Sequence, residues 1–332
     1  MTRISVIGAG AWGTALADLL ARKGHEVRIW AYEAEVVESI NARHENALFM
    51  PGHALGPTLR ACADAHEAVA SAPVVVSASP SHVVRAVTAP LAGSIASDAI
   101  VVSATKGIEP SSLLLMHAVL AETLPGRRVV ALSGPSFARE VFEGQPTAVV
   151  AAAEEEATSA TVQEIFATPR FRVYSNQDVP GVELCGALKN VIAIAAGILE
   201  GMGLGNNPRA ALITRGLAEM TRLGLAMGAK PMTFAGLAGM GDLILTTTGA
   251  LSRNRSLGVA LAEGQGLAEY TAAHRTVAEG VNTARSAVQL GERHGVELPI
   301  TQQVASILFE GKAPKQAVAE LMERALKSEQ WR

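Results

Sequence analysis

Three glycines near the start of the chain have the spacing of a dinucleotide-binding turn. Gly8, Gly10 and Gly13 form the pattern GxGxxG between a β-branched run at residues 4–7 and a helical stretch at residues 14–23. In such a turn the first glycine permits the bend, the second admits a pyrophosphate, and the third allows close helix–strand packing. Amides and the dipole at the helix start attract the phosphates. We predict dinucleotide binding here, and a strand–helix turn without a ligand is the alternative.

The residues that follow the second predicted strand bear on the choice of nucleotide. Glu33 lies 20 residues after Gly13, just past a strand predicted at residues 26–30. An acid at this point can accept a hydrogen bond from the 2′-hydroxyl of the adenosine ribose, whereas a 2′-phosphate favours a cation. Its neighbours Ala31 and Tyr32 supply no cation. Taken alone, these residues at the end of the strand favour NAD over NADP. The alternative is that Glu33 is only an acid in the first turn of a helix.

One lysine interrupts a long apolar helical stretch. Lys189 lies within residues 179–199, where Ala, Leu, Ile, Val and Gly dominate. A lysine on a buried face is costly unless it is paired or functional. Desolvation would also lower its pKa toward neutrality, which suits proton transfer. Lys189 is therefore a candidate general acid and base, and the alternative is a side chain that extends along the helix to reach solvent.

Three further segments could contact an anionic ligand. Lys106 follows a strand predicted at residues 100–102, on the side of an α/β sheet where ligands bind; otherwise it is a surface lysine. The small residues 133–136 also follow a strand and could offer backbone amides to an anion, or form a simple turn. Residues 252–255, Ser-Arg-Asn-Arg, precede a predicted helix and could bind phosphate, or only cap that helix.

Composition excludes several classes of site and partner. The formal net charge is −3 and no Lys/Arg block occurs, so a nucleic-acid or membrane-surface role has no electrostatic support. Cys62 and Cys185 are the two cysteines, without CxxC, HExxH or a Cys/His cluster. We therefore expect no metal site and a reducing compartment. Glycines and Asp18 interrupt the first apolar run, so we expect no signal peptide, no membrane span and a cytoplasmic protein.

The order of predicted elements changes partway along the chain. β-branched runs alternate with helical stretches in the first half, at residues 4–7, 26–30, 74–76, 100–102, 129–132, 148–150 and 171–174. Such nearly continuous apolar runs predict strands buried on both faces of a parallel sheet. Long helical patterns follow, near residues 179–199, 209–227, 256–263, 281–293, 301–309 and 315–326. We predict an α/β doubly wound Rossmann domain at residues 1–180 and an all-α domain at residues 181–332.

Several segments, taken together, resemble one enzyme family. They are GAGAWGTALA at 8–17, SATKGIEP at 103–110, SGPSFARE at 133–140, FRVYSNQD at 171–178, GALKNVIAIAAG at 186–197, NPRAALITRGLAEM at 207–220, GMGDLILT at 239–246, SRNR at 252–255 and VAEGVNTA at 277–284. They are similar to the signature segments of bacterial-type NAD(P)-dependent glycerol-3-phosphate dehydrogenases, in the same order and over nearly the whole chain.

The resemblance implies a reaction and a set of roles. Members of this family are homodimers that interconvert dihydroxyacetone phosphate and sn-glycerol 3-phosphate, a precursor of phospholipids. Lys189 matches their catalytic lysine, which gives or takes the proton at the C2 oxygen. The substrate-site positions that match are Lys106, Gly134, Ser136, Lys189, Asp242, Ser252, Arg253 and Asn254. The cofactor-site positions are Gly8, Gly10, Ala11, Trp12, Gly13, Tyr32, Lys106, Ala138, Arg253, Val277 and Glu279.

One position departs from the family pattern. Family members often carry His or Arg where this chain has Tyr32, and those residues suit NADPH. The resemblance therefore favours NADP, whereas Tyr32 followed by Glu33 leaves NAD open. Two rival functions remain at this point. One is a dehydrogenase of the same architecture that acts on a hydroxy acid or sugar acid, and the other is a nucleotide sensor, which would need no Lys189.

Overall fold

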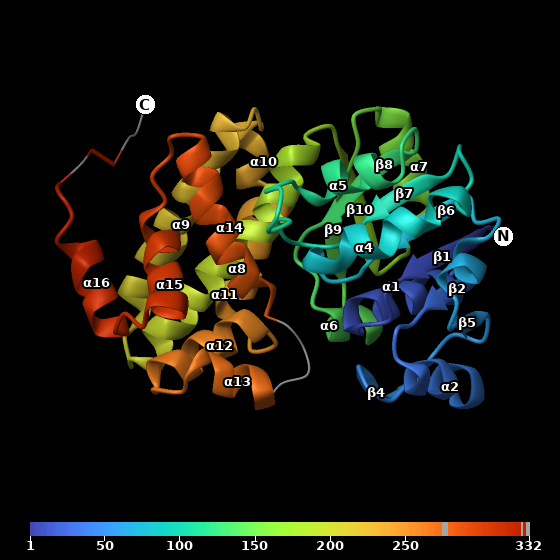
Figure 1. The fold of residues 1–332 in the computed structure, drawn as a ribbon, viewed down its shortest axis with the longest axis horizontal. Coiled ribbons are helices and arrows are strands. Elements are labelled where there is room, and N and C mark those ends of the chain that lie inside the picture. Colours follow the sequence, from blue (N-terminus) through green and yellow to red (C-terminus); the bar gives the residue numbers. More distant parts are fainter. Residues whose placement is uncertain (274–277, 327, 330–332) are drawn as a thin grey trace.

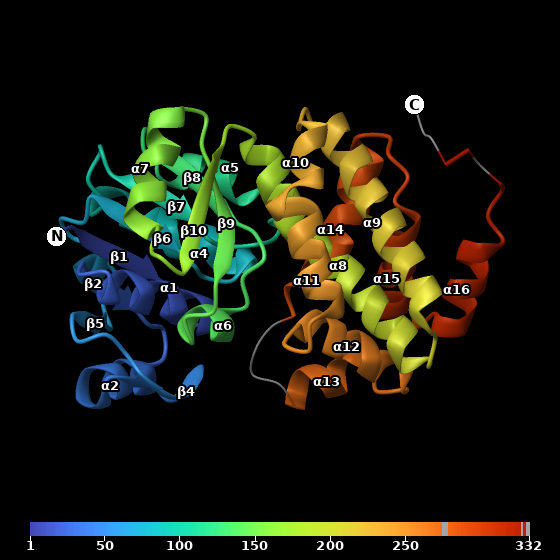
Figure 2. The same cartoon turned by 180° about the vertical axis from the view of Figure 1, so that it is seen from behind.

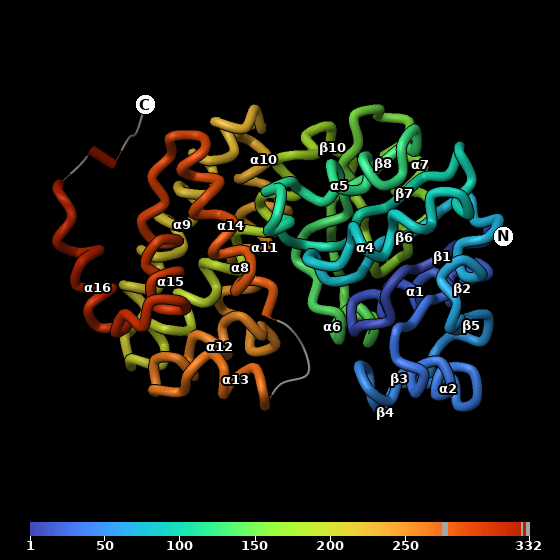
Figure 3. Tube along the Cα trace, in the orientation of Figure 1, coloured from blue at the N-terminus to red at the C-terminus, as the bar shows by residue number. Residues whose placement is uncertain are grey.

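The β-branched runs of the first half form one large sheet. The computed structural model describes residues 1–273, 278–326, 328 and 329, and within them a sheet half and a helical half lie side by side (Figure 1). The strands are β1 Arg3–Ile7, β2 Glu26–Trp30, β3 Glu45–Asn46, β4 Met50–Ala54, β5 Leu59–Cys62, β6 Val74–Ser77, β7 Ile100–Ser103, β8 Arg128–Ser133, β9 Thr147–Ala152 and β10 Phe171–Asn176. In the described part of the chain, β3 and β4 form a separate hairpin beside α2 (Figure 3).

The order of strands is that of a doubly wound sheet. It runs β10-β9-β8-β7-β6-β1-β2-β5, and β1 pairs in parallel with both β2 and β6. After β1 the chain adds β2 and β5 on one side of that strand and then β6 to β10 on the other side. This change of side creates a crevice at the carboxyl end of β1. The predicted Rossmann architecture of the first half is confirmed, including all seven predicted strands. The short edge strand β5 and the hairpin were not predicted.

The prediction of a parallel sheet is wrong at one pairing, that of β8 with β9. Strands β9 and β10 are parallel to each other, but β9 pairs with β8 in the antiparallel sense. The reason lies in residues 134–146, which connect β8 to β9 and contain only the 5-residue helix α6, Ala138–Phe142. That helix is about 7 Å long, whereas a 6-residue strand is about 20 Å long. The helix is thus too short to carry the chain back along the length of β8, as the helix of a parallel crossover usually does.

Helices cover both faces of the sheet. They are α1 Ala11–Arg22, α2 Ala34–Arg43, α3 Ala65–Val69, α4 Val84–Thr88, α5 Met116–Thr123, α6 and α7 Glu156–Phe166, with the 3₁₀ segments η1 Ser81–Val83 and η2 Ala89–Gly93. Alternate strand residues enter different cores. Val74 and Val76 belong to the core that includes residues of α1, α2 and α7, whereas Val75 belongs to the core that includes residues of α3, α4 and α5. This burial on both faces explains the continuous apolar runs of the strands.

The helical half is built around α8, Val179–Gly201. The other helices are α9 Asn206–Ala226, α10 Pro231–Ala235, the π-helical segment η3 Leu237–Gly241, α11 Asp242–Thr248, α12 Arg253–Ala262, α13 Leu267–Ala273, α14 Glu279–Arg293, α15 Pro299–Glu310 and α16 Pro314–Met322. Helices α9, α11, α12, α14 and α15 surround α8, and α16 lies at the end farthest from the sheet (Figures 1 and 2). All six predicted helices of this half are confirmed, whereas α10, η3, α11 and α13 were not predicted.

Glycines allow α8 to pack backbone to backbone. A Cβ at Gly197 would lie 1.9 Å from the carbonyl oxygen of Arg255, and one at Gly258 would lie 2.1 Å from that of Ile194. By length and composition α8 could cross a membrane, but its apolar window is completely buried inside this protein, as expected of a core helix. The chain leaves the sheet at Asn176 and α8 begins three residues later. The domain limits 1–180 and 181–332 stay a prediction.

Candidate functional site

The glycine turn after β1 has the shape that a pyrophosphate requires. Gly8 has a φ of +109°, which favours glycine, and a Cβ there would lie 2.9 Å from the backbone nitrogen of Ser79. A Cβ at Gly13 would lie 1.9 Å from the carbonyl oxygen of Gly8. At Gly10, in contrast, a Cβ would meet no atom within 4 Å, so the space before this residue is open. Ala11 is the first residue of α1. These residues therefore fit a dinucleotide.

A tryptophan connects this turn to the first lysine of the site. The indole Nε1 of Trp12 donates a hydrogen bond of 3.2 Å to the carbonyl oxygen of Ala104. Ala104 lies just after β7, two residues before Lys106. Because β7 is parallel to β6, and β6 to β1, their carboxyl ends meet at the same edge of the sheet. The predicted cofactor turn and Lys106 are therefore neighbours.

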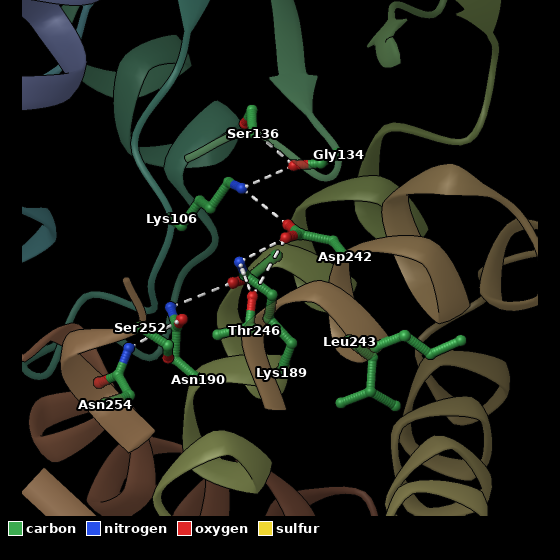
Figure 4. Close-up of polar contacts among 12 residues, drawn as sticks. Lys106, Gly134, Ser136, Lys189, Asn190, Asp242, Leu243, Thr246, Ser252 and Asn254 are labelled. Atoms are coloured by element: carbon green, nitrogen blue, oxygen red, sulfur yellow. Dashed lines mark hydrogen bonds and ion pairs between the residues drawn. The ribbon is translucent and has the colours of Figure 1, made fainter. Parts of the chain in front are cut away.

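Two lysines share one carboxylate at the junction of the two halves (Figure 4). Lys189 Nζ from α8 donates to Asp242 Oδ1 at 2.6 Å and to Thr246 Oγ1 at 2.7 Å. Lys106 Nζ donates to Asp242 Oδ2 at 2.7 Å and to the carbonyl oxygen of Gly134 at 3.1 Å. The side chains of Asp242 and Lys189 are 1% and 8% exposed, and that of Lys106 is 17% exposed. The cluster is thus almost dry, with Lys106 at its more open edge.

This arrangement moves the proton affinity of Lys189 into the physiological range. Burial lowers the pKa of Lys189 to about 7, against the opposing attraction of Asp242 and with further lowering by the charge of Lys106. A single carboxylate cannot neutralise two ammonium groups, so one of the two lysines binds its proton less tightly than a free lysine does. Since Lys189 is the more buried of the two, it can give and take a proton near neutral pH.

A short π-helical segment sets the position of Asp242. Segment η3 ends at Gly241 and α11 begins at Asp242, so the carboxylate projects from the first residue of a helix. A Cβ at Gly239 would lie 2.1 Å from the carbonyl oxygen of Phe234, so the tight bend requires glycine there. Thr246 follows one turn later on the same face of α11 and also bonds Asp242, at 3.2 Å. Local backbone geometry therefore presents both groups to Lys189.

The loop after β8 forms the other side of the cluster. Gly134 has a φ of +140°, and a Cβ there would lie 2.9 Å from the Cα of Val149. Its carbonyl oxygen accepts from Lys106 and, at 3.0 Å, from Ser136 Oγ. Ala138 is the first residue of α6, which follows directly. The predicted substrate residues Lys106, Gly134 and Ser136 thus lie together.

A chain of amides joins α8 to α12 and α14. Asn254 Nδ2 donates to Asn190 Oδ1 at 3.0 Å, and Asn254 Oδ1 accepts from the backbone nitrogen of Gly280 at 2.9 Å. Ser252 is the N-cap of α12, where its hydroxyl accepts from the backbone nitrogen of Arg255 at 3.3 Å. The Arg253 side chain is exposed and makes no hydrogen bond or ion pair with any residue that the structure describes. Arg253 is therefore left available to an anion.

The remaining predicted cofactor residues differ in their placement. Glu279, the first residue of α14, accepts a hydrogen bond of 2.8 Å from Ser81 Oγ and so connects the helical half to the sheet half. Burial raises the pKa of Glu279, against the opposing effects of Ser81, His82 and Arg253. Tyr32, two residues past the end of β2, is 84% exposed. Val277 lies outside the described residues.

Three residues of this network were missed in the sequence. Thr246 contacts Lys189, Asn190 contacts Asn254, and Ser81 contacts Glu279. Thr246 stands four residues after Asp242, a spacing that places both on one helix face once a helix at residues 242–248 is recognised. Asn190 is the neighbour of Lys189 in the same apolar run, which was a usable signal. Nothing in the local pattern marks Ser81. Among the described residues, no group of three or more His, Cys, Asp or Glu side chains could hold a metal ion.

Comparisons with known proteins agree over nearly the whole chain. The family model for the NAD-dependent glycerol-3-phosphate dehydrogenase N-terminus matches residues 3–159, and the model for the C-terminus matches residues 178–319. A glycerol-3-phosphate dehydrogenase, NAD(P)+, from Geobacter sulfurreducens is 58% identical over 332 residues, which cover 99% of each chain. A crystal structure of glycerol-3-phosphate dehydrogenase from Coxiella burnetii is 42% identical with a TM-score of 0.94, covering 97% of this chain and 99% of that one. The enzyme from Saccharomyces cerevisiae is 28% identical with a TM-score of 0.83, covering 97% and 99%.

Proposed function

Because this chain belongs to the NAD-dependent glycerol-3-phosphate dehydrogenase family, we propose that it reduces dihydroxyacetone phosphate to sn-glycerol 3-phosphate, reversibly. The observation that carries the proposal is the pair of lysines on Asp242, beside an open dinucleotide turn. The product would supply glycerophospholipid synthesis. The resident cofactor would be NADH or NADPH, held at Gly8, Gly10, Ala11, Trp12, Gly13 and Ala138, with Tyr32 at the ribose and Glu279 and Val277 on the helical side.

The reaction requires a hydride and a proton. The hydride for C2 of the ketone would be supplied by a nicotinamide bound at the glycine turn. Lys189, protonated, donates its proton to the C2 oxygen as negative charge develops there, and in the reverse direction it accepts that proton. Asp242 holds the ammonium of Lys189 in place at 2.6 Å. Because Asp242 also binds Lys106, it cannot fully neutralise Lys189, and the proton remains transferable.

The phosphate of the substrate would lie at the start of α12. Ser252, Arg253 and Asn254 all lie there, but their side chains differ in availability. The hydroxyl of Ser252 caps the helix, and the amide of Asn254 is bonded to Asn190 and Gly280. Among the described residues, none has a hydrogen bond or ion pair with Arg253 that would compete with the phosphate, and the amides at the helix start add to the attraction. Such remote binding energy orients the reacting carbon between Lys106, Ser136 and Lys189.

Assembly and location form a further part of the proposal. We propose a homodimer, because large apolar side chains are exposed on adjoining elements of the helical half: Leu225 on α9, Met232 on α10, Met240 on η3 and Ile244 on α11. A second copy could cover them. Cys62 and Cys185 are free thiols, which suits the reducing cytoplasm. Sedimentation velocity and cell fractionation test these two points.

The deciding experiment compares two ketones. Purified protein should oxidise NADH or NADPH with dihydroxyacetone phosphate, and much less with unphosphorylated dihydroxyacetone. Arg253→Ala should raise KM for the phosphorylated ketone by roughly ten- to a hundredfold, the cost of losing about 1.5–3 kcal/mol of charge-assisted bonding. Equal activity on both ketones would exclude the phosphate site. Activity on hydroxy acids or sugar acids instead would support a different dehydrogenase, and nucleotide binding without turnover would support a sensor.

A further inference from the structure

A buried asparagine outside the glycine turn contacts that turn from the other side. We propose that Asn46, in the β3–β4 hairpin, is a positioning residue that orients the Ala9–Gly10 peptide so that the Gly10 amide faces the cofactor pyrophosphate. The inference rests on the proposed nucleotide binding at residues 8–13. It assigns a role in cofactor binding to a hairpin that takes no part in the large sheet and contains none of the residues assigned to the site above.

The amide of Asn46 is fully used. Its Nδ2 donates to the carbonyl oxygen of Ala9 and to Thr14 Oγ1, both at 2.8 Å, and its Oδ1 accepts from the backbone nitrogen of Phe49 at 3.0 Å. Thr14 Oγ1 in turn donates to the carbonyl oxygen of Ala9 at 3.1 Å. Asn46 and Thr14 are both 0% exposed. With every donor and acceptor engaged, only one orientation of the Asn46 amide satisfies the network.

This network determines the direction of the adjacent N–H. In a trans peptide the carbonyl oxygen of Ala9 and the N–H of Gly10 point in opposite directions. Asn46 and Thr14 hold the carbonyl oxygen toward the hairpin, so the N–H of Gly10 is turned away from it. Within the described residues that N–H donates no hydrogen bond, and the space beside Gly10 is open. A free, oriented backbone donor at the start of α1 is what a phosphate oxygen binds.

The hairpin is itself fixed to α1, so that Asn46 acts from a rigid base. Asp18 Oδ1 accepts from the backbone nitrogen of Gly56 at 2.7 Å, and the guanidinium of Arg22 donates to the carbonyl oxygen of Ala54 at 2.5 Å. Asp18 and Arg22 are also paired with each other at 2.6 Å. The chain from Asn46 to Gly56 is thus held against the first helix at both ends. This arrangement explains how a segment without strong strand propensity keeps Asn46 in register.

The test measures nucleotide binding separately from turnover. Asn46→Ala should raise the Kd for NADH by about tenfold, the effect of weakening one amide–pyrophosphate hydrogen bond. It should raise the Kd for ADP-ribose by a similar factor, because that ligand carries the pyrophosphate without the nicotinamide. The kcat with saturating NADH and dihydroxyacetone phosphate should stay within about twofold. Thr14→Val, which removes the other donor to Ala9, should act in the same direction and less than additively with Asn46→Ala.

A matched control separates positioning from stability. Asn41→Ala removes two hydrogen bonds of 2.9 Å to Ala61 on the edge strand, in the same half of the molecule. It should lower the melting temperature without changing either Kd. Unchanged NADH affinity in folded Asn46→Ala and Thr14→Val proteins would overturn the inference, as would an equal loss of affinity in Asn41→Ala. If Asn46→Ala does not fold, Asn46→Ser and Thr14→Val decide the matter. A wild-type protein that fails to bind NADH would instead refute the proposed function.

Discussion

Replacement of Lys189 by methionine is the sharpest test of the proton-transfer role. Methionine matches the lysine stem, so the substitution removes the ammonium and little volume. Asp242 would not be left alone, because it keeps Lys106 at 2.7 Å and Thr246 at 3.2 Å. Losing charge-assisted bonds costs about 1.5–3 kcal/mol, and removal of a buried charge offsets part of that cost. We therefore expect a folded protein whose melting temperature falls by roughly 10 °C at most.

The expected loss of turnover is much larger. Positioned acid–base catalysis contributes roughly 10²–10⁴-fold, which corresponds to about 3–5 kcal/mol of barrier. Lys106 cannot replace Lys189, because its Nζ is held by Gly134 and by the far oxygen of Asp242. We expect kcat with dihydroxyacetone phosphate to fall by that factor in Lys189→Met, while the Kd for NADH stays unchanged. The assay is steady-state turnover together with NADH fluorescence titration and thermal melting.

A second lysine provides the matched control. Lys312 is a partly buried lysine that pairs with Glu320 at 2.8 Å. It lies between α15 and α16, and α16 is at the end of the helical half farthest from the sheet (Figure 1). Lys312→Met should alter the melting temperature slightly and leave kcat unchanged. The reasoning fails if Lys189→Met binds NADH, melts normally and still turns over within about tenfold of the wild type. A lysine that merely extended to solvent would give that result.

Four other predictions depend on the same geometry. Gly10→Val should fold normally, because its Cβ meets no atom within 4 Å, yet it should abolish NADH binding in a fluorescence titration; unchanged affinity would refute the glycine turn. Glu33→Gln should lower the NADH-to-NADPH ratio of kcat/KM by roughly tenfold, since a carboxylate at the ribose repels a 2′-phosphate; an unchanged ratio would mean that Glu33 only begins α2. Reduction requires protonated Lys189, so its rate should fall as pH rises through about 7, whereas oxidation should rise. Lys106→Met removes a charge that lowers the pKa of Lys189, so the pH dependences of reduction and of oxidation should both move to higher pH. An unchanged pH profile would contradict the electrostatic coupling of the two lysines.

Elements with strong local patterns were predictable from the sequence. The strand–turn–helix unit around Gly8 depends on residues that are adjacent in the chain. Its backbone conformation and close contacts require glycine at fixed positions, and this requirement is visible in the sequence. The core helix α8 was equally clear, because burial on all sides requires an unbroken apolar stretch in which Lys189 stands out. The central strands β6 and β7 are predicted from apolar runs, because helices cover both faces of these strands.

Elements that depend on distant contacts were not predictable. The hairpin that carries Asn46 contains Pro51 and Gly52, and it is held by side chains of α1, not by its own propensity. The antiparallel direction of β9 accompanies a connection whose helix, α6, has only 5 residues, and periodicity does not report the direction of a strand. Segment η3 also requires a partner, since Gly239 bends the chain over the carbonyl oxygen of Phe234. Asp242 could be named from the family resemblance, but its two lysine partners could not be derived from spacing.

The packing of α8 and the chemistry of the cluster have a common physical basis. Gly186 lies one turn before Lys189, and a Cβ there would lie 2.8 Å from Ser133 Oγ and 3.4 Å from the Cγ of Lys106. The absence of a side chain at Gly186 therefore lets the stem of Lys106 lie against α8 and bring its Nζ to Asp242. The same close approach excludes water from the cluster, and this desolvation is the main cause of the low pKa of Lys189. A larger residue at Gly186 would separate the two lysines, and each would then be better solvated. The close contact between the two halves of the molecule thus accounts both for the stable junction and for a lysine that can exchange its proton near neutral pH.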